Sequence, residues 1–270
     1  PILNLAADKL VKKIAAISEE SFIVPAHIWT PHFSLFGSSS GFDKIEECFE
    51  GETKRIYALE TGLSSDPPMS WRLSSLDKIS LISNSDAHSP GKIAREANVF
   101  SAKFSYKELL EILRTRDKKK FLYTIEFFPE EGKYHWDGHR ACNIRLSPEE
   151  SLNVSNRCPK CGKKITIGVL NRCEKLSDRA AGFRLNNVPG FKSLVPLSEI
   201  IAEALNIGRD SLTSEKEYQR LIGQFGTEFD ILLDIPERDL LEKCPPKIVR
   251  GILNAREGKV KKLPGYDGVY

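Results

Sequence analysis

Short apolar runs alternate along the N-terminal half of this chain with segments of helical periodicity. Three runs of branched or aromatic residues, each followed by polar residues, have the length of buried strands: Phe22–Val24, Ile56–Leu59 and Ile79–Ser83. Between and around them, apolar residues recur every three or four positions, which predicts amphipathic helices over 5–17, 41–49 and 106–114 and a helix that begins at Trp71. Strands that alternate with helices predict an α/β fold with a parallel sheet.

Polar residues that can bind metals follow all three predicted strands. Because the carboxyl ends of parallel strands meet at one edge of a sheet, these residues are expected to share a site. In extended chain, residues i and i+2 point to the same face, so Asp86 and His88 are expected about 7 Å apart on one side. Imidazole and carboxylate groups suit divalent cations. We therefore predict a metal cluster formed by His27, Glu60, Asp86 and His88. For Asp86-Ala87-His88 alone, the competing interpretation is a hydrogen-bonded pair in a structural loop.

A second candidate metal site follows a change of composition after Phe127-Phe128-Pro129, where we place a domain boundary near residue 128. Cys158-Pro-Lys-Cys161-Gly is a tight knuckle whose two thiolates can reach one zinc ion at about 2.3 Å. The residues alone leave open which two of His139, Cys142 and Cys173 complete the site. Four protein ligands would make this zinc structural, stabilising a module too small to fold on its own core.

The remainder of the chain has helical periodicity. The helices are expected at Leu197–Leu205, Glu215–Phe225, Phe229–Leu233, Glu237–Lys243 and Ile248–Ala255. The predicted domains are thus an α/β domain over 1–128, a zinc-binding module over 129–180 and a helical domain over 181–270.

Composition and charge narrow the class of protein. Apolar residues make up 40% of the chain and charged residues 29%, as in globular proteins, and there is no run of eighteen apolar residues that would span a membrane. No signal-peptide pattern begins the sequence, so a cytoplasmic protein is expected, and its six cysteines favour zinc over disulfides. The net charge is only +3, but residues 131–180 carry 10 Lys and Arg against 6 Asp and Glu, and residues 240–264 carry 7 against 2. This excess can contact phosphates or simply face solvent.

Three long motifs, in order and at matching spacing, carry a family resemblance. They are Pro-Ala-His-Ile-Trp-Thr-Pro at 25–31, Leu-Glu-Thr-Gly-Leu-Ser-Ser-Asp-Pro at 59–67 and Ser-Asn-Ser-Asp-Ala-His-Ser-Pro at 83–90. With them the chain resembles, over essentially its whole length, the PHP-domain endonuclease Q family. The resemblance implies a distorted (β/α)7 barrel with metal ions at the strand ends. It also implies cleavage of DNA on the 5′ side of deaminated bases (uracil, hypoxanthine, xanthine) and of abasic sites.

The same resemblance bears on the second site and on the ends of the barrel. The family keeps the His-x-x-Cys motif and lacks a cysteine at the position of Cys173, which favours His139, Cys142, Cys158 and Cys161 as the zinc ligands. The His-x-His motif of the first PHP strand does not occur here. We therefore expect a fragment that holds only part of the barrel, needs the N-terminal part of the same protein and cleaves weakly or not at all alone. His32 stands where the family has an aromatic residue, so we expect it to line the pocket or face DNA rather than to bind metal.

The expected chemistry is hydrolysis of a phosphodiester. Clustered zinc, manganese or magnesium ions would lower the pKa of the attacking water and neutralise the phosphate, and Asp86 is the residue expected to orient that water or accept its proton. A base within a duplex must be extruded, read at its edge and stacked on its face, a role for which Trp29 is also considered. The expected DNA contacts are Ser64, Ser65, Trp71, Arg72, Arg95 and Arg140, with core aromatics or surface loops as the alternative. Two further functions are weighed: a PHP phosphatase for a small phosphate ester and a non-catalytic DNA-binding fragment.

Overall fold

The structure, a computed structural model, describes residues 3–270, which divide into two units. The first unit extends to Lys192 and takes up the chain again over Leu263–Tyr270, and the second comprises Ser193–Lys262. The predicted division at residues 128 and 180 stays a prediction.

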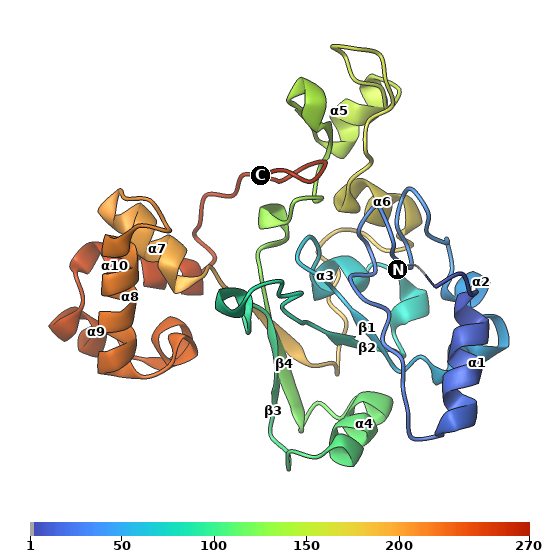
Figure 1. The fold of residues 1–270 in the computed structure, drawn as a ribbon, viewed down its shortest axis with the longest axis horizontal. Helices are drawn as coiled ribbons and strands as arrows, with labels where there is room; N and C mark the ends of the chain where they lie inside the picture. The colour runs from blue at the N-terminus through green and yellow to red at the C-terminus, as the bar shows by residue number, and fades with distance from the viewer. Residues whose placement is uncertain (1–2) are drawn as a thin grey trace. The chain divides into compact units, whose positions relative to one another are not determined.

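A parallel pair of strands lies within the first unit, as expected. β1 (Ala58–Glu60) and β2 (Ser80–Ile82) pair in parallel, with Glu60 opposite Ile82. The predicted strands at 56–59 and 79–83 are confirmed in shorter form, and α1 (Ala7–Ile17) confirms the first amphipathic helix. Figure 1 shows β1 and β2 side by side.

Two sequence predictions in this region are wrong. Phe22–Val24 is not a strand. It leads to Pro25, which has no N–H to donate, and to His27, whose positive φ of 31° turns the chain. No helix begins at Trp71; α3 (Pro67–Ser70) ends just before it, after starting at Asp66, whose side chain accepts a hydrogen bond from the Met69 backbone N–H. The remaining short helical segments are α2 (Ile45–Phe49), η1 (Glu50–Arg55), η2 (Ser74–Leu76) and η3 (Pro90–Lys92).

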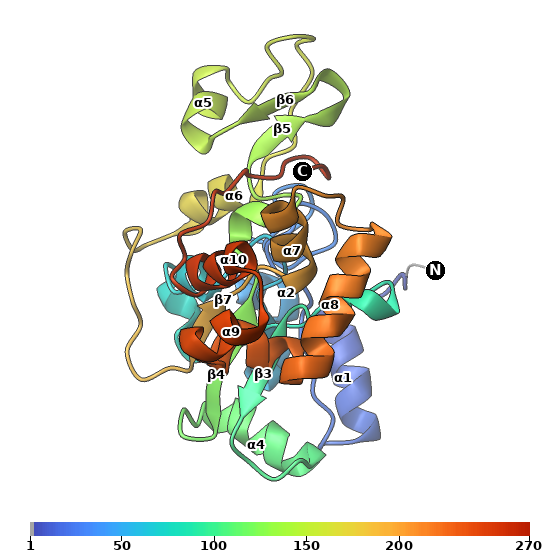
Figure 2. The ribbon, with the colours of Figure 1, turned by 90° about the vertical axis from the view of Figure 1, so that its left-hand side faces the viewer.

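The second sheet of this unit departs from the parallel pattern. β3 (Ala97–Phe100) pairs antiparallel with β4 (Phe121–Glu126), and β7 (Gly190–Ser193) joins it in the order β3-β4-β7. Figures 1 and 2 show α4 (Tyr106–Thr115) beyond the ends of β3 and β4, so the chain reverses there instead of crossing a sheet face. An α/β fold is therefore present, with the parallel pair β1–β2 and the antiparallel pair β3–β4 in separate sheets, and the seven-stranded barrel stays a prediction.

The main core of this unit joins segments far apart in the sequence. Ile28, Trp29 and Leu59 are at most 1% exposed and belong to one cluster with Val169 and Cys173. The last two residues lie on α6 (Val169–Leu176), which the sequence placed in the zinc module. The apolar face of α4 packs in a second cluster, whose members are Ala58, Ile82, Ile112, Leu113 and Phe121.

The segment after residue 128 forms a hairpin followed by short helices. β5 (Asp137–His139) and β6 (Ile144–Leu146) are antiparallel and labelled in Figure 2. The connecting helical segments are η4 (Pro129–Glu131), η5 (Arg140–Cys142) and α5 (Pro148–Asn153). The C-terminal residues return to this hairpin: the Trp136 backbone N–H donates to Gly265 O (2.9 Å) and the Tyr266 hydroxyl to Asn143 Oδ1 (2.7 Å).

The second unit is helical, as predicted. It contains α7 (Leu197–Leu205), α8 (Leu212–Phe225), a π-helical turn (Asp230–Asp234), α9 (Glu237–Lys243) and α10 (Pro246–Arg256). Its core is apolar and fully buried at Leu197, Ile201, Leu221, Ile231, Leu240, Ile248 and Ile252. The Arg256 guanidinium donates to the carbonyls of Ile231, Leu232 and Ile235 at 2.7–2.9 Å, which satisfies the end of the π-helical turn.

Candidate active site and metal centre

Glu60, at the end of β1, connects two of the loops that carry predicted ligands. Its carboxylate accepts hydrogen bonds from the His27 backbone N–H (2.7 Å) and from the Asn84 side-chain amide (2.9 Å). The Thr30 hydroxyl lies 3.1 Å from His27 Nδ1. The parallel register of β1 and β2 thus brings Glu60 and Asn84 together. Backbone hydrogen bonds from Glu60 N to Pro25 O and from Ile28 N to Glu60 O place His27 beside them, although no strand precedes His27 within residues 3–26.

The backbone of His27 is held in an unusual conformation. A positive φ of 31° is sterically unfavourable for a residue with a Cβ, and such strain persists where the surroundings fix it. Gly62 lies against it: a Cβ at Gly62 would come within 2.7 Å of His27 Cβ. Gly62 itself has a φ of 77°, so the Thr-Gly-Leu motif needs glycine there for two reasons.

Asp86 and His88 do not lie on a strand, which corrects the expected geometry. β2 ends at Ile82, and Asp86 has a φ of 44°. The two side chains still meet: His88 Nδ1 lies 2.9 Å from the Asp86 carbonyl and 3.9 Å from Asp86 Oδ1. The His88 side chain is 83% exposed. Arg95 holds this loop, since its guanidinium donates to Ser85 O (2.7 Å) and Asp86 O (3.3 Å).

The protonation of His88 follows from this contact. A carbonyl oxygen only accepts hydrogen bonds, so Nδ1 of His88 carries the hydrogen that faces Asp86 O. In the neutral ring, Nε2 then has a free lone pair, the state of a metal-binding histidine. The four predicted ligands nevertheless do not converge on one point: within residues 3–270, His27, Glu60, Asp86 and His88 are not among any set of three or more ligand atoms within 4.8 Å of one another.

Two carboxylates that the sequence analysis missed are buried beneath this region. Glu126, at the end of β4, accepts hydrogen bonds from the Thr61 hydroxyl (2.9 Å) and the Ser83 hydroxyl (3.0 Å). Glu96 accepts one from the Phe127 backbone N–H (3.0 Å). Burial raises the pKa of Glu96 to about 7 and raises that of Glu126 well above its usual value; the charge of Glu60 also raises the pKa of Glu96, and the charge of Glu96 that of Glu126. Glu96 lies just before β3 and Glu126 at the end of β4, and neither belongs to a recognisable motif, so nothing in the local sequence indicates that their carboxylates are buried.

The predicted substrate contacts divide between core and surface. Ser64, Ser65 and Trp71 are at most 8% exposed, and the Trp71 ring packs edge-on against Phe191. Trp29 is 1% exposed and donates from its indole to Ser70 Oγ (3.1 Å). The rings of Trp29 and Trp71 are therefore core side chains, which is the alternative to DNA contacts that the sequence analysis gave. Arg72 donates to Arg179 O, Arg95 positions the Asp86 loop, and Arg140 is exposed.

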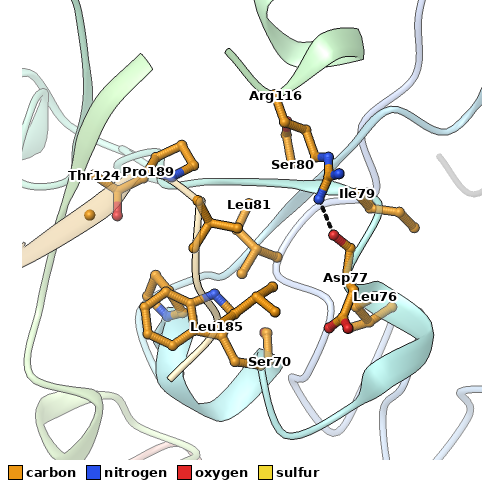
Figure 3. Close-up of a pocket in the computed structure, with 14 residues that line it drawn as sticks. Ser70, Leu76, Asp77, Ile79, Ser80, Leu81, Arg116, Thr124, Leu185 and Pro189 are labelled. Carbon is orange, nitrogen blue, oxygen red and sulfur yellow. Dashed lines mark hydrogen bonds between the residues drawn. The ribbon is translucent and has the colours of Figure 1, made fainter. Parts of the chain in front are cut away.

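A cavity beside Trp71 is too small for a substrate. It holds about 20 Å³, the room of roughly one water molecule. Figure 3 shows Leu76, Leu81 and Leu185 around it and Arg116 bonded to the backbone of Asp77. We therefore regard it as a packing defect of the core.

The second site has the geometry expected of a metal centre. His139, Cys142, Cys158 and Cys161 each offer a ligand atom, and all four atoms lie within 4.8 Å of one another. The hairpin β5–β6 supplies the first two residues and the knuckle the others. Cys173 lies elsewhere: it is buried on α6, its thiol donates to Met69 O (3.2 Å), and burial raises its pKa to about 11. It is therefore outside the cluster, as the resemblance implied.

The cluster favours a thiolate at Cys158 and a thiol at Cys142, because the hydrogen bond with the Cys161 side chain raises the pKa of Cys142 to about 11. Burial opposes ionisation of Cys158, but the His139 side chain and the backbone N–H groups of Cys161 and Lys160 lower its pKa to about 6. The thiolate is the form that binds metal ions. Three sulfurs and one imidazole, in tetrahedral arrangement, are a donor set typical of structural zinc.

The hairpin is tied to the rest of its unit on two sides. The Asp137 carboxylate accepts from the Gly168 backbone N–H and from the Asn171 side-chain amide, both at 2.6 Å. On the other side, Asp267 accepts from the Arg140 backbone N–H (2.7 Å) and from the Thr166 hydroxyl (2.6 Å). We call the segment Pro264–Tyr270, which carries Asp267, the C-terminal strap.

Among the residues that the structure describes, no helix is long and apolar enough to cross a membrane.

Comparison with known sequences identifies one matching family and two relatives that are longer than this chain. The family described as the MJ0043 C-terminal domain matches residues 196–259, most of the second unit. Protein MJ0043 of Methanocaldococcus jannaschii is 32% identical over 282 positions, covering all of this chain and 35% of its own length. YqxK of Bacillus subtilis is 34% identical over 251 positions, covering 92% of this chain and 59% of that protein. The chain thus spans about a third and three-fifths of these two relatives.

Comparison with solved structures identifies a common fold. The lesion-specific endonuclease PfuEndoQ from Pyrococcus furiosus superposes with a TM-score of 0.86 and 30% identity, over 99% of this chain and 65% of that one. A structure of endonuclease Q in complex with a 27-mer duplex substrate, with an abasic lesion at the active site, matches with a TM-score of 0.87 and 29% identity. That match covers 100% of this chain and 67% of the other.

Proposed function

Since this chain belongs to the endonuclease Q family, we propose that it is part of a metal-dependent endonuclease that repairs DNA. Its substrate would be DNA with a deaminated base (uracil, hypoxanthine, xanthine) or an abasic site, cut on the 5′ side of the lesion. One observation carries the proposal: the likeness to endonuclease Q extends over the whole chain, in sequence and fold together, and one of the matched structures holds a lesion duplex.

In this proposal the site is built from the loops that follow β1 and β2. His27, Glu60, Asp86 and His88 would hold the catalytic cations. These residues suit a cation because both histidine rings are oriented. The Thr30 hydroxyl is hydrogen-bonded to Nδ1 of His27, and Asp86 O to Nδ1 of His88, which leaves Nε2 of each ring for a metal ion. When bound, divalent cations such as zinc, manganese or magnesium would lower the pKa of water and neutralise phosphate charge.

The chain's own residues have separate tasks in the reaction. Asp86 would accept the proton of the attacking water as its oxygen bonds to phosphorus and the bond from phosphorus to the leaving oxygen breaks. Arg95 keeps the Asp86 carbonyl in place, and Asn84 keeps the Glu60 carboxylate in place. Arg72 and Arg140 are proposed phosphate contacts; Ser64 and Ser65, buried at the Thr61–Asp66 turn, are proposed to shape the base pocket through their backbone rather than through exposed hydroxyls.

The His139, Cys142, Cys158 and Cys161 cluster would hold a structural zinc ion in the same protein. Its donor set and closed geometry support this role. The exposed basic side chains on the module, Arg140, Lys160, Lys163 and Lys164, would bring positive charge to the DNA backbone.

Two other functions are less well supported. A phosphatase for a small ester would need a pocket of substrate size beside the predicted ligands, whereas none of those ligands lines the cavity of about 20 Å³ at Trp71 or the cavity of about 370 Å³ at Tyr57 and Tyr106. A non-catalytic DNA-binding fragment would share the fold, and activity separates it from the nuclease.

The experiment compares cleavage of defined duplexes. The chain is incubated with manganese or magnesium and duplexes that carry deoxyuridine, deoxyinosine, an abasic site or no lesion, and with p-nitrophenyl phosphate in parallel. We expect weak or no nicking by this chain alone, nicking on the 5′ side of the lesions by a version extended at the N-terminus, and no release of nitrophenol by either. Phosphate release from the small ester alone, or neither nicking nor binding of any lesion duplex, would contradict the proposal.

Asp86→Asn tests the assignment of the base. The substitution removes the proton acceptor but keeps the size of the side chain, so we expect at least an about 100-fold loss of nicking. Binding of the abasic duplex in a gel-shift assay should change by no more than about twofold, because the side chain is not a principal phosphate contact. Undiminished nicking would show that Asp86 has another role.

A further inference from the structure

Phe33 is an exposed aromatic ring in a segment, residues 28–40, whose other large apolar residues are buried. Its relative exposure is 81%, whereas Ile28, Trp29, Leu35 and Phe36 are at most 5% exposed. The loop therefore folds its apolar side chains inward and leaves this one in water. Such exposure of a single phenylalanine contributes nothing to the stability of the fold.

The conformation of Phe33 is also unfavourable. Its φ is 55°, in the left-handed region that bulky side chains rarely adopt and that glycine or asparagine adopt readily. Local bonds impose it: the Phe36 backbone N–H donates to Ile28 O (2.7 Å), the Thr30 hydroxyl lies 3.2 Å from His32 O, and Ser34 Oγ donates to Thr30 O. A turn that forces positive φ and yet carries phenylalanine indicates that the ring has a task outside the fold.

A buried arginine from α6 fixes the far side of the loop. Arg172 is 6% exposed and donates to Phe36 O (2.7 Å), Phe42 O (2.9 Å) and Asp43 Oδ1 (2.7 Å). At Gly37, a Cβ would lie 2.4 Å from Thr30 O, so the two arms of the loop are in backbone contact. The loop is thus rigid, and a ring presented on it loses little conformational freedom when it binds.

The loop is continuous with the candidate active site. Thr30 contacts both His27 Nδ1 (3.1 Å) and His32 O (3.2 Å), which links the predicted ligand to the residue before Phe33. His32 in turn lies edge-on to Tyr134, with ring centroids 6.4 Å apart. Within residues 28–40 the other exposed side chains are polar, His32, Ser39 and Ser40 among them, so Phe33 is the one exposed apolar ring of this segment, and the next exposed apolar ring along the chain is Phe42 (40%). A protein partner needs a contiguous patch, whereas a single base step accommodates a single ring.

We propose that Phe33 contacts the nucleic acid directly, inserting at the base step next to the lesion and stacking there in place of the displaced nucleotide. The inference rests on the proposed function. A nucleotide that leaves the duplex opens a gap in the base stack, and a rigid apolar wedge fills that gap and disfavours its closure.

The test measures base stacking and affinity together. An abasic duplex carries 2-aminopurine beside the lesion, a base whose fluorescence rises when it is unstacked from its neighbour. We expect binding of the wild-type chain to lower the fluorescence, because the Phe33 ring stacks on the 2-aminopurine at the gap. Phe33→Ala should abolish most of this decrease and weaken binding of the abasic duplex about tenfold, as expected for loss of one base–aromatic contact. Phe33→Trp should restore both.

Two further variants separate contact from folding. Phe104→Ala removes another exposed phenylalanine, 94% exposed and remote in sequence, and should leave fluorescence and affinity within about twofold of wild type. Phe33→Gly relieves the positive φ, so its thermal midpoint should not fall below that of Phe33→Ala while its fluorescence response is lost.

The outcomes distinguish the two proposals. If lesion duplexes bind and are nicked while Phe33→Ala gives the wild-type fluorescence and affinity, the role of Phe33 is wrong and the nuclease function stands. If wild type binds without a change in fluorescence, insertion is wrong. If no lesion duplex binds or is nicked, the proposed function fails and the inference with it.

Discussion

Glu96 and Glu126 carry carboxyl groups that are buried in the folded chain. Neither Glu96 Oε2 nor Glu126 Oε1 has a hydrogen-bond partner among the described residues, and burial raises the pKa of both groups. A protonated carboxyl is cheaper to bury than a carboxylate, so the folded chain holds protons here that the unfolded chain releases. The two residues lie under the loops of Glu60 and Asn84, where a change in charge affects the floor of the candidate site.

The pH dependence of stability follows from Glu96. Its pKa is about 7 in the folded chain and near 4.5 in the unfolded chain, so the folded state binds more protons between these values. The free energy of unfolding should therefore fall as the pH rises from 4.5 to 7, and level off above 7. Glu96→Gln keeps the neutral form at every pH, so we expect it to raise the free energy of unfolding at pH 8 by roughly 1–3 kcal/mol.

Urea unfolding followed by circular dichroism at several pH values measures this effect. The exposed Glu19 provides the matched control, because Glu19→Gln should leave the pH slope unchanged. A Glu96→Gln variant that kept the wild-type slope would show that another group is responsible.

At the scale of elements, the proposed zinc site depends on four ligands from two short segments, the β5–β6 hairpin and the Cys158–Cys161 knuckle. Cys158→Ser removes one thiolate from the cluster, so bound zinc should fall by about one equivalent after mild dialysis. Cys173→Ser is the control that separates the two candidate ligand sets, because Cys173 donates to Met69 O outside the cluster. Metal analysis of both variants gives the answer; zinc lost from Cys173→Ser and kept in Cys158→Ser would reverse the assignment.

The C-terminal strap is expected to hold that hairpin in place. Asp267→Ala removes the acceptor of two hydrogen bonds, from the Arg140 backbone N–H and the Thr166 hydroxyl. Leaving these donors without partners should destabilise the first unit by about 1–3 kcal/mol and speed the release of zinc to a chelator. Asp210→Ala, which removes an exposed carboxylate of the second unit, should do neither. Equal zinc release from wild type and Asp267→Ala would mean that the strap does not support the metal site.

At the scale of the whole molecule, the chain consists of two units, and we expect the second to fold without the first. The second unit, Ser193–Lys262, has its own fully buried apolar core and coincides with a separately recognised sequence family. We therefore expect residues 193–262, expressed alone, to give a helical circular dichroism spectrum and a single cooperative thermal transition. A non-cooperative melt would show that the unit needs the rest of the chain.

Elements whose formation is local can be predicted from the amino-acid sequence alone. Periodicity located α1, α4 and the C-terminal helices, because the burial of a helix face leaves a repeat of three to four residues in the sequence. The knuckle Cys158–Cys161 and its partners His139 and Cys142 were also foreseen, with the resemblance deciding between these and Cys173. Short chain spacing and specific ligand chemistry restrict such a site strongly.

Features that depend on segments distant in the sequence emerge only from the fold. Trp71 and Trp29 are core side chains, and Asp86 lies four residues beyond the end of β2 with a positive φ that no apolar pattern encodes. Glu96, just before β3, and Glu126, at the end of β4, have raised pKa values because the fold buries both carboxyl groups. The reason is general: periodicity reports which face of an element is buried, whereas the environment of a charge depends on which other elements bury it.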